Sequence, residues 1–211
     1  MAWFAEYTNG YASSYGFADD RNIANMSEAQ IGNAFEVYNQ LSMYGWSVNA
    51  IAAVVSNMLS ESYINPGQRE HQYSLDTLIG GYGLCQWTDV PSQGVYNNTV
   101  LHNWLNSNGY ALTDGYAQVE FLDGMDNYLP GQWISNANSG YLSWNEFRTS
   151  QLDPATLARY FFYGYERGTW NVIRESNANY FYQLFNGVTP VPPSKSHRKM
   201  PIYFYLKPQR R

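Results

Sequence analysis

Apolar residues recur at helical spacing in several stretches that are separated by glycine-rich or proline-rich breaks. Each of the first two stretches follows a serine that can cap a helix. Ser27 is followed by Gln30 at the capping-box position, and Ser47 precedes the second stretch. The pattern therefore predicts one helix that ends near Gly45 and a second that ends just after Glu61.

Later stretches predict further helices, each next to a glycine, a proline or an aspartate. They are residues 97–107, residues 116–128, a stretch that opens at Asp153-Pro154, and residues 170–185. Asp153-Pro154 is the clearest start, because aspartate caps helices and proline suits the first helical position. Residues 68–83 show no period and end in glycines, which predicts an irregular loop or a small hairpin at a functional site. The predicted fold class is mainly α.

The chain divides into three predicted parts. Residues 1–25 are rich in Tyr, Gly, Ser and Asn and form an irregular N-terminal arm, and residues 26–187 form one domain. Residues 188–211 combine a proline-containing linker with a basic and aromatic tail. This tail is either a solvated basic segment or a strand that docks on another protein, with nucleic-acid contact a third reading.

The composition limits the classes of function. The 211 residues suit one domain, and only 14% are charged against a typical figure of about 25%. Twenty tyrosines and seven tryptophans suit either sugar stacking or a core whose polar groups find partners. The net charge of −5 argues against nucleic-acid binding by the main body.

The sequence also lacks several common signals. Cys85 is the single cysteine, so we expect no internal disulfide and no thiol pair for zinc. The three histidines form no metal-ligand pattern, and we expect neither a metal nor a cofactor. Residues 1–6 lack the features of a signal peptide and no window is long enough for a membrane span, so we expect synthesis in a cytoplasm and no membrane span.

Glu61 is the first candidate for chemistry. It ends an otherwise apolar helix, where burial and the negative end of the helix dipole both oppose ionisation of its carboxyl. Such a group suits a general acid that protonates a glycosidic oxygen. The alternative is an ordinary helix-end glutamate in water.

The second candidate is the glycine-rich segment of residues 81–88. Its glycines allow a backbone to approach a ligand, and the Gln86 amide can hydrogen-bond a sugar amide or a water. A tight turn that leads into a buried Trp87 is the alternative. Glycosidases need an acid and a stabiliser of an oxocarbenium-like transition state in one cleft, which Glu61 and this segment could supply together.

Three motifs in this order and spacing resemble the phage tail lysozyme family over roughly residues 28–185. They are Asn57-Met58-x-x-Glu61-Ser62-x-x-Asn65-Pro66-Gly67, then Gly81-Tyr82-Gly83-Leu84-x-Gln86-Trp87-Thr88, then Tyr165-Glu166-Arg167. This family is related in fold to soluble lytic transglycosylases and goose-type lysozymes. The resemblance implies a lysozyme-like fold and a glycosidase of peptidoglycan, carried on a phage tail in the virion.

The resemblance also implies roles for single residues. Glu61 is the expected catalytic acid, cleaving the linkage between N-acetylmuramic acid and N-acetylglucosamine in peptidoglycan glycan strands. The residues expected to bind substrate along the cleft are Tyr82, Gly83, Gln86, Trp87 and Tyr165. The arm and the tail are the expected contacts with other phage tail proteins.

The third motif departs from the family, because Gly168 stands where proline is expected, which loosens that loop. We expect Glu166 to pair with an arginine and to be structural. The candidate second carboxylate is Asp76, with Glu70 and Asp89 as weaker candidates. If none of these serves, a substituent of the substrate attacks instead, so hydrolysis and transglycosylation both stay open.

Three alternative functions remain at this level. A cysteine endopeptidase would use Cys85 as nucleophile and His71 or His102 as base. A structural tail protein would keep the lysozyme fold without catalysis. A free endolysin would share the glycosidase activity but not the virion attachment.

Overall fold

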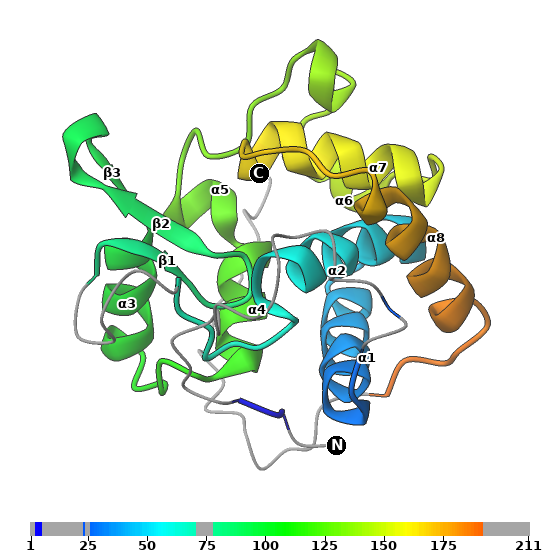
Figure 1. The fold of residues 1–211 in the computed structure, drawn as a ribbon, viewed down its shortest axis with the longest axis horizontal. Coiled ribbons are helices and arrows are strands. Elements are labelled where there is room, and N and C mark those ends of the chain that lie inside the picture. Colours follow the sequence, from blue (N-terminus) through cyan, green and yellow to red (C-terminus); the bar gives the residue numbers. More distant parts are fainter. Residues whose placement is uncertain (1–2, 6–22, 24–25, 71–77, 192–211) are drawn as a thin grey trace, which may run out of the picture.

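The structure is a computed structural model that describes residues 3–5, 23, 26–70 and 78–191. It is mainly helical with one small antiparallel sheet, which confirms the predicted fold class and is consistent with a lysozyme-like fold (Figure 1). Most of the predicted arm and the tail beyond Val191 lie outside the described residues.

The helices cover most of the described sequence. The longer ones are α1 (Glu28–Met43), α2 (Val48–Ser62), α3 (Asn97–Ser107), α4 (Gly115–Asp123), α7 (Pro154–Phe161) and α8 (Ile173–Phe185). The shorter ones are α5 (Met125–Tyr128), α6 (Trp144–Thr149), the 3-10 turns η3 (Pro91–Gln93) and η4 (Ala137–Ser139), and the π-helical turn η5 (Phe162–Glu166). The strands are β1 (Gly80–Tyr82), β2 (Trp87–Val90) and β3 (Val95–Tyr96).

The predicted helix starts are confirmed at both serines. The Ser27 side chain accepts a hydrogen bond from the backbone of Gln30, whose side chain accepts one from the Ser27 backbone, so the capping box is complete. The Ser47 side chain caps α2 by accepting a hydrogen bond from the Ala50 amide. Tyr63 then ends α2 in a left-handed conformation with φ of 55°, one residue after Ser62.

Helix α2 is the central element of the core. It packs against α1, α7 and α8, and its residues from Ala50 to Leu59 are all buried. A helix that is buried on every face is stable only when neighbours surround it, as here. The last turn of α2, which carries Glu61, is therefore held by the core.

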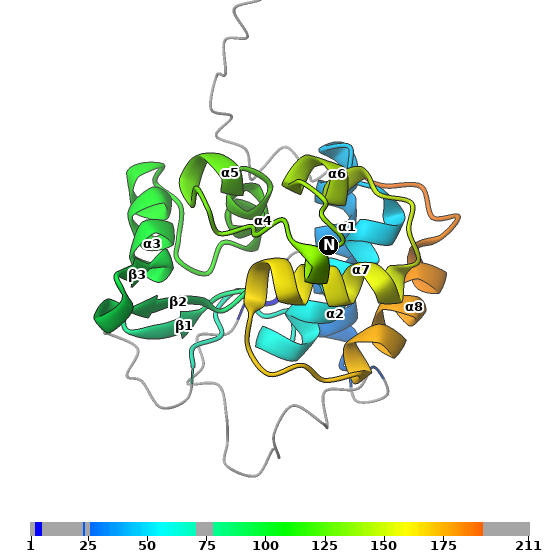
Figure 2. The ribbon, with the colours of Figure 1, turned by 90° about the horizontal axis from the view of Figure 1, so that it is seen from above.

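The sheet forms a separate layer at the end of the molecule away from α8 (Figures 1 and 2). Its strands run antiparallel in the order β1-β2-β3, with Gly81 opposite Thr88 and Tyr82 opposite Trp87. Helix α3 packs against β1 and β2. A hairpin begun by Gly80 and Gly81 thus lies at the end of the predicted 68–83 loop, of which residues 71–77 lie outside the described residues.

Two helical predictions differ from the structure, and one further helix was not predicted. The helix predicted over 116–128 is divided at Gly124, where an added Cβ would lie 2.5 Å from the Tyr128 ring. The last helix begins at Ile173 rather than at residue 170, because the Asn171 side chain accepts a hydrogen bond from the Ile173 amide and sets the start there. Helix α6, with a capping box at Ser143, was not predicted.

Within the described ranges, no helix is both long enough and apolar enough to cross a bilayer.

Candidate active site

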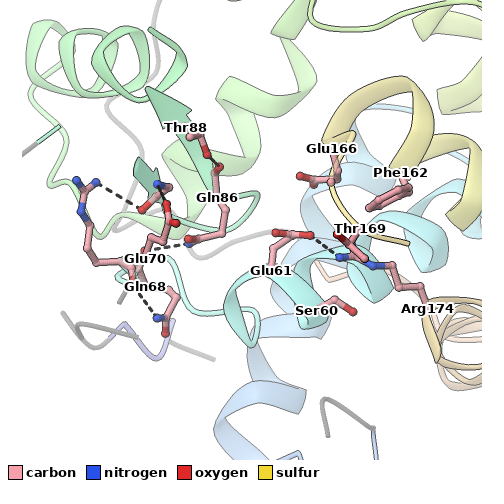
Figure 3. A pocket seen from close by; sticks show the side chains of 13 residues that line it. Ser60, Glu61, Gln68, Glu70, Gln86, Thr88, Phe162, Glu166, Thr169 and Arg174 are labelled. Atoms are coloured by element: carbon pink, nitrogen blue, oxygen red, sulfur yellow. Dashed lines mark hydrogen bonds and ion pairs between the residues drawn. The ribbon is translucent and has the colours of Figure 1, made fainter. Parts of the chain in front are cut away.

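A cleft of about 400 Å³ lies between the last turn of α2 and the hairpin. Figure 3 shows side chains from two walls that face each other across it. The wall near the helices carries Ser60, Glu61, Phe162, Glu166, Thr169 and Arg174, and the opposite wall carries Gln68, Glu70, Gln86 and Thr88. The cleft therefore joins segments that are more than a hundred residues apart in the chain.

Glu61 lies in this cleft with its side chain 21% exposed and pairs with a buried arginine. Arg174 Nη2 donates to Glu61 Oε1 at 2.5 Å, and Arg174 Nη1 donates to Asn57 Oδ1 at 2.7 Å. Asn57 and Glu61 are four residues apart in α2, so they present their side chains on the same face. One guanidinium thus fixes the direction of the Glu61 carboxyl.

Arg174 is itself held on two sides. Asn57 Nδ2 donates to the carbonyl oxygens of Ala53 and Ala158, at 2.9 and 3.1 Å, which orients its amide toward the arginine. The Arg174 guanidinium also lies 5.0 Å from the centre of the Phe162 ring, within range of a cation–π contact. The Glu61 carboxyl is therefore positioned by packed groups from α2, η5 and α8.

Glu166 lies on the same wall of the cleft as Glu61 and does not match its prediction. We expected it to pair with an arginine, but within the described ranges it has no ion pair or hydrogen bond to one. Arg167 donates instead to Gln132 Oε1 at 3.0 Å, and Arg174 is occupied by Glu61 and Asn57. Burial raises the pKa of Glu166 well above its ordinary value, and the charge of Glu61 raises it further, against opposing effects of Arg174 and Arg167.

The glycine-rich segment is tied to both neighbouring helices. Ser62 Oγ donates to the Leu84 carbonyl at 2.8 Å, which links it to the end of α2. Gln118 of α4 accepts from the Leu84 amide at 2.9 Å and donates to the Pro66 carbonyl at 2.8 Å. Gly83 has φ of +75° and leaves no room for a side chain beside Gln118. The segment is thus a fixed part of the cleft.

Gln86 lies on the cleft wall, where the sequence led us to expect it. Its backbone has φ of 45°, an uncommon value for a residue other than glycine that often marks functional sites. Its amide nitrogen donates to the Gln68 and Gly83 carbonyls at 3.2 and 3.1 Å. An added Cβ on Gly81 would lie 2.6 Å from its side-chain oxygen, so a glycine there gives this side chain room. Its contact with a sugar stays a prediction.

A second pocket of about 300 Å³ continues from the first. Trp87 and Tyr165 line it, and each residue is 2% exposed. Burial raises the pKa of Tyr165, which keeps its hydroxyl neutral. The pocket shares Gln86, Thr88 and Glu166 with the first one, so the two form neighbouring parts of one groove.

Tyr82 and Gly83 line neither of these two pockets. Tyr82 is fully buried, with its ring 5.0 Å from that of His102. Side chains alternate between the two faces of a strand, so Gly81 faces the cleft and Tyr82 faces the core. The cleft-lining role expected for the Tyr82 side chain is therefore corrected to a role in packing.

The three candidates for a second carboxylate have different positions. Asp76 lies outside the described residues. Glu70 lines the cleft, where its Oε2 accepts from the Gly81 amide at 2.7 Å. Asp89 is buried away from the cleft and accepts from the Asn98 and Thr99 amides at the start of α3, so it has a structural role.

The geometry disfavours the cysteine nucleophile. Burial raises the pKa of the Cys85 thiol well above its ordinary value, and the charges of Glu166 and Glu61 raise it further. A nucleophilic cysteine needs the opposite shift, toward the thiolate. His102 packs on Tyr82, and His71 lies outside the described residues. Elsewhere in the described ranges, no three His, Cys, Asp or Glu side chains are grouped to hold a metal.

Comparison with known proteins shows the family. Residues 32–185 match the sequence profile described as phage tail lysozyme. The chain belongs to this family. It is also 32% identical over 158 residues to morphogenesis protein 1 of Bacillus phage B103, an alignment that covers 74% of this chain and 40% of that protein. The chain thus spans about two fifths of the length of this relative.

The part that matches the phage tail lysozyme family contains every cleft residue discussed above. Sequence reasoning missed Arg174 altogether and missed the place of Glu166 in the cleft. A separation of 113 residues divides Arg174 from Glu61, and no local motif marks it. For Glu166 a signal was present, because it neighbours Tyr165, which the family resemblance directed to the cleft.

Proposed function

We propose that this chain is a peptidoglycan-degrading glycosidase that cleaves the linkage between N-acetylmuramic acid and N-acetylglucosamine. The observation that carries the proposal is the partly buried Glu61 carboxyl, held by Arg174 on the wall of a cleft of about 400 Å³. Polar groups of Gln68, Gln86 and Thr88 face it and are suited to hydrogen-bond sugar hydroxyl and acetamido groups. Membership of the phage tail lysozyme family supports the same substrate.

In the proposed reaction, Glu61 gives its proton to the glycosidic oxygen as the bond to the anomeric carbon breaks. Arg174 then stabilises the carboxylate left on Glu61, and the sugar carries the developing positive charge. A water, or an oxygen of the substrate itself, attacks the anomeric carbon and returns a proton to Glu61. Attack by water gives a reducing end, and attack by a hydroxyl of the same sugar gives an anhydro end.

We further propose that the enzyme acts as part of a phage tail and helps it to penetrate the cell wall at infection. The family description and the relative from a Bacillus phage, named a morphogenesis protein, favour this over a free endolysin. The N-terminal arm or the C-terminal tail would contact other tail proteins.

The test compares the wild type with Glu61→Gln on purified peptidoglycan and identifies the released ends by mass spectrometry. Glutamine keeps the shape of glutamate and an oxygen for Arg174 but has no proton to transfer. We expect turnover to fall by about a hundred- to ten-thousandfold. Glu175→Gln is the matched control, because Glu175 pairs with Arg159 outside the cleft.

Each outcome has a distinct meaning. New reducing or anhydro ends from the wild type and the control, but not from Glu61→Gln, support the glycosidase and identify its reaction. Free amines from all three proteins would point to peptide cleavage and contradict the proposal. No released fragment from any of them would leave a structural role.

A further inference from the structure

Glu166 occupies the junction between the two pockets of the groove. It lines the pocket that contains Glu61 and also the one that contains Trp87 and Tyr165. A glycan chain that extends from one pocket into the other must pass its carboxyl. Figure 3 shows the Glu166 side chain above that of Glu61, on the same wall of the cleft.

One oxygen of the half-buried Glu166 side chain has no hydrogen-bond partner among the residues that the structure describes. This atom, Oε1, is itself buried. A buried carboxylate without a donor is strongly disfavoured, and such a group keeps its proton instead. The neutral acid carries an O–H, and that O–H needs an acceptor.

The charged and titratable groups around Glu166 come from every neighbouring element. Glu61 of α2 opposes its ionisation, whereas Arg174 of α8 and the adjacent Arg167 favour it. Cys85 of the glycine-rich segment and Tyr165 of η5 are both buried and neutral. Both arginines already donate to other side chains, Arg174 to Glu61 and Arg167 to Gln132. Burial and Glu61 are therefore the larger influences.

We propose that Glu166 is a second functional carboxyl of this groove, which donates a hydrogen bond to a glycan oxygen where the two pockets meet. A neutral carboxyl can donate, and it does not repel the Glu61 carboxylate formed during the reaction. An ionised group here could only accept and would add a second negative charge beside the first. The inference rests on the proposed glycosidase function and adds a substrate contact to it.

Two substitutions of Glu166 distinguish a role as hydrogen-bond donor from a role that needs a titratable proton. Glu166→Gln keeps a hydrogen-bond donor and cannot ionise, whereas Glu166→Met fills a similar volume without any donor. We expect Glu166→Gln to lower turnover of peptidoglycan by no more than about fivefold and Glu166→Met to lower it by about ten- to a hundredfold. Thermal unfolding of both variants reports whether the fold is kept.

The pH profile gives a readout that a purely structural role would not change. The wild type should lose activity as the pH rises and Glu166 ionises, because the donor is lost and a second charge appears. Glu166→Gln should show a smaller alkaline loss than the wild type, because only the requirement for the proton of the catalytic acid remains. Glu175→Gln, outside the cleft, should follow the wild type.

Two results would overturn the inference. If Glu166→Gln is as inactive as Glu166→Met, the group must transfer a proton or act as an anion. If Glu166→Met is as active as the wild type, the group has no contact with substrate. If the wild type releases no sugar ends, the proposed function is contradicted. The role of Glu166 is then tested by the affinity of the wild type, Glu166→Gln and Glu166→Met for solubilised glycan strands, which should fall only in Glu166→Met.

Discussion

At the scale of single residues, two arginine–glutamate pairs in this fold have different surroundings. The side chains of Arg174 and Glu61 are 5% and 21% exposed, whereas those of Arg159 and Glu175 are 50% and 23% exposed. Loss of one partner from a buried pair leaves a charge with little water around it. An exposed pair is screened, and its loss changes stability little.

This contrast predicts different results for the same substitution at the two arginines. Arg174→Met should destabilise the protein by roughly 2–4 kcal/mol, somewhat less than for a fully buried pair because Glu61 keeps some contact with water. It should also lower peptidoglycan turnover, because the Glu61 carboxyl loses its direction. Arg159→Met should cost less than about 1 kcal/mol. Urea unfolding measures both, and equal losses would contradict the packing described around Arg174.

Glu166 predicts a pH dependence of stability. Its pKa is raised in the folded state, so between the unfolded value of about 4.3 and the folded value the folded protein holds a proton that the unfolded chain has released. Stability is therefore lost as the pH rises through this window, and Glu166→Gln should avoid the loss. We expect Tm of the variant to match that of the wild type near pH 4 and to exceed it by about 3 °C or more at pH 8.

Glu146 supplies a control of opposite sign. Hydrogen bonds from Ser143 lower the pKa of Glu146, so its contribution to stability is present above the unfolded value and is lost as the pH falls. Glu146→Gln should thus have a lower Tm than the wild type at pH 8, with the difference shrinking toward pH 4. A Tm difference for Glu166→Gln that does not change with pH would show that folding does not raise the pKa of Glu166.

At the scale of elements, one hydroxyl joins the end of α2 to the glycine-rich segment. Ser62 Oγ donates to the Leu84 carbonyl, and its removal leaves that buried oxygen with one donor fewer. Ser62→Ala should therefore destabilise the protein by about 1–3 kcal/mol. Hydrogen exchange should also become faster at residues 84–87, since the segment is less firmly held.

Ser56→Ala is the matched control within the same helix. Ser56 is equally buried, but in the described part of the chain its hydroxyl donates only to the Ala53 carbonyl inside α2. The control should be milder and should leave exchange at residues 84–87 unchanged. If both variants accelerate exchange there, the effect comes from the helix as a whole and not from the Ser62 contact.

Helices could be predicted from the sequence where nearby residues in the chain determine their start or end. The capping serines, the aspartate and proline before α7 and the range of α3 all depend on residues within one turn, and the structure confirms them. The break at Gly124 depends on the Tyr128 ring, which the periodicity of the stretch does not show. The π-helical turn η5, which carries Tyr165 and Glu166, likewise cannot be recognised from apolar residues spaced 3.6 apart.

At the scale of the whole molecule, the site was predictable only in part. Glu61 and Gln86 could be found, because each lies in a short motif and both line the cleft. Arg174 could not, since a partner 113 residues away is defined only by how α8 packs on α2. Tyr82 was assigned to the wrong face because the hairpin register decides which of two neighbours points into the cleft.

The N-terminal segment gives the last prediction, because part of it packs against the predicted 26–187 domain. The Trp3 ring lies 5.7 Å from the Tyr116 ring, at 86° to it, and occupies the space beside Gly115. The backbone of Phe4 exchanges two hydrogen bonds with the Asn33 side chain, at 2.7 and 2.8 Å. These contacts attach residues 3 and 4 to α1 and α4.

Trp3→Ala should therefore lower the stability of the full chain by roughly 1–3 kcal/mol, about half the usual loss for a fully buried aromatic ring, because Trp3 is only partly buried. Phe4→Ala should cost no more than about 0.5 kcal/mol, since its side chain is 43% exposed and its hydrogen bonds come from the backbone. Urea unfolding of the two variants measures the difference. Equal stability would mean that the domain is complete from residue 26, whereas the expected loss extends its packing unit to include Trp3.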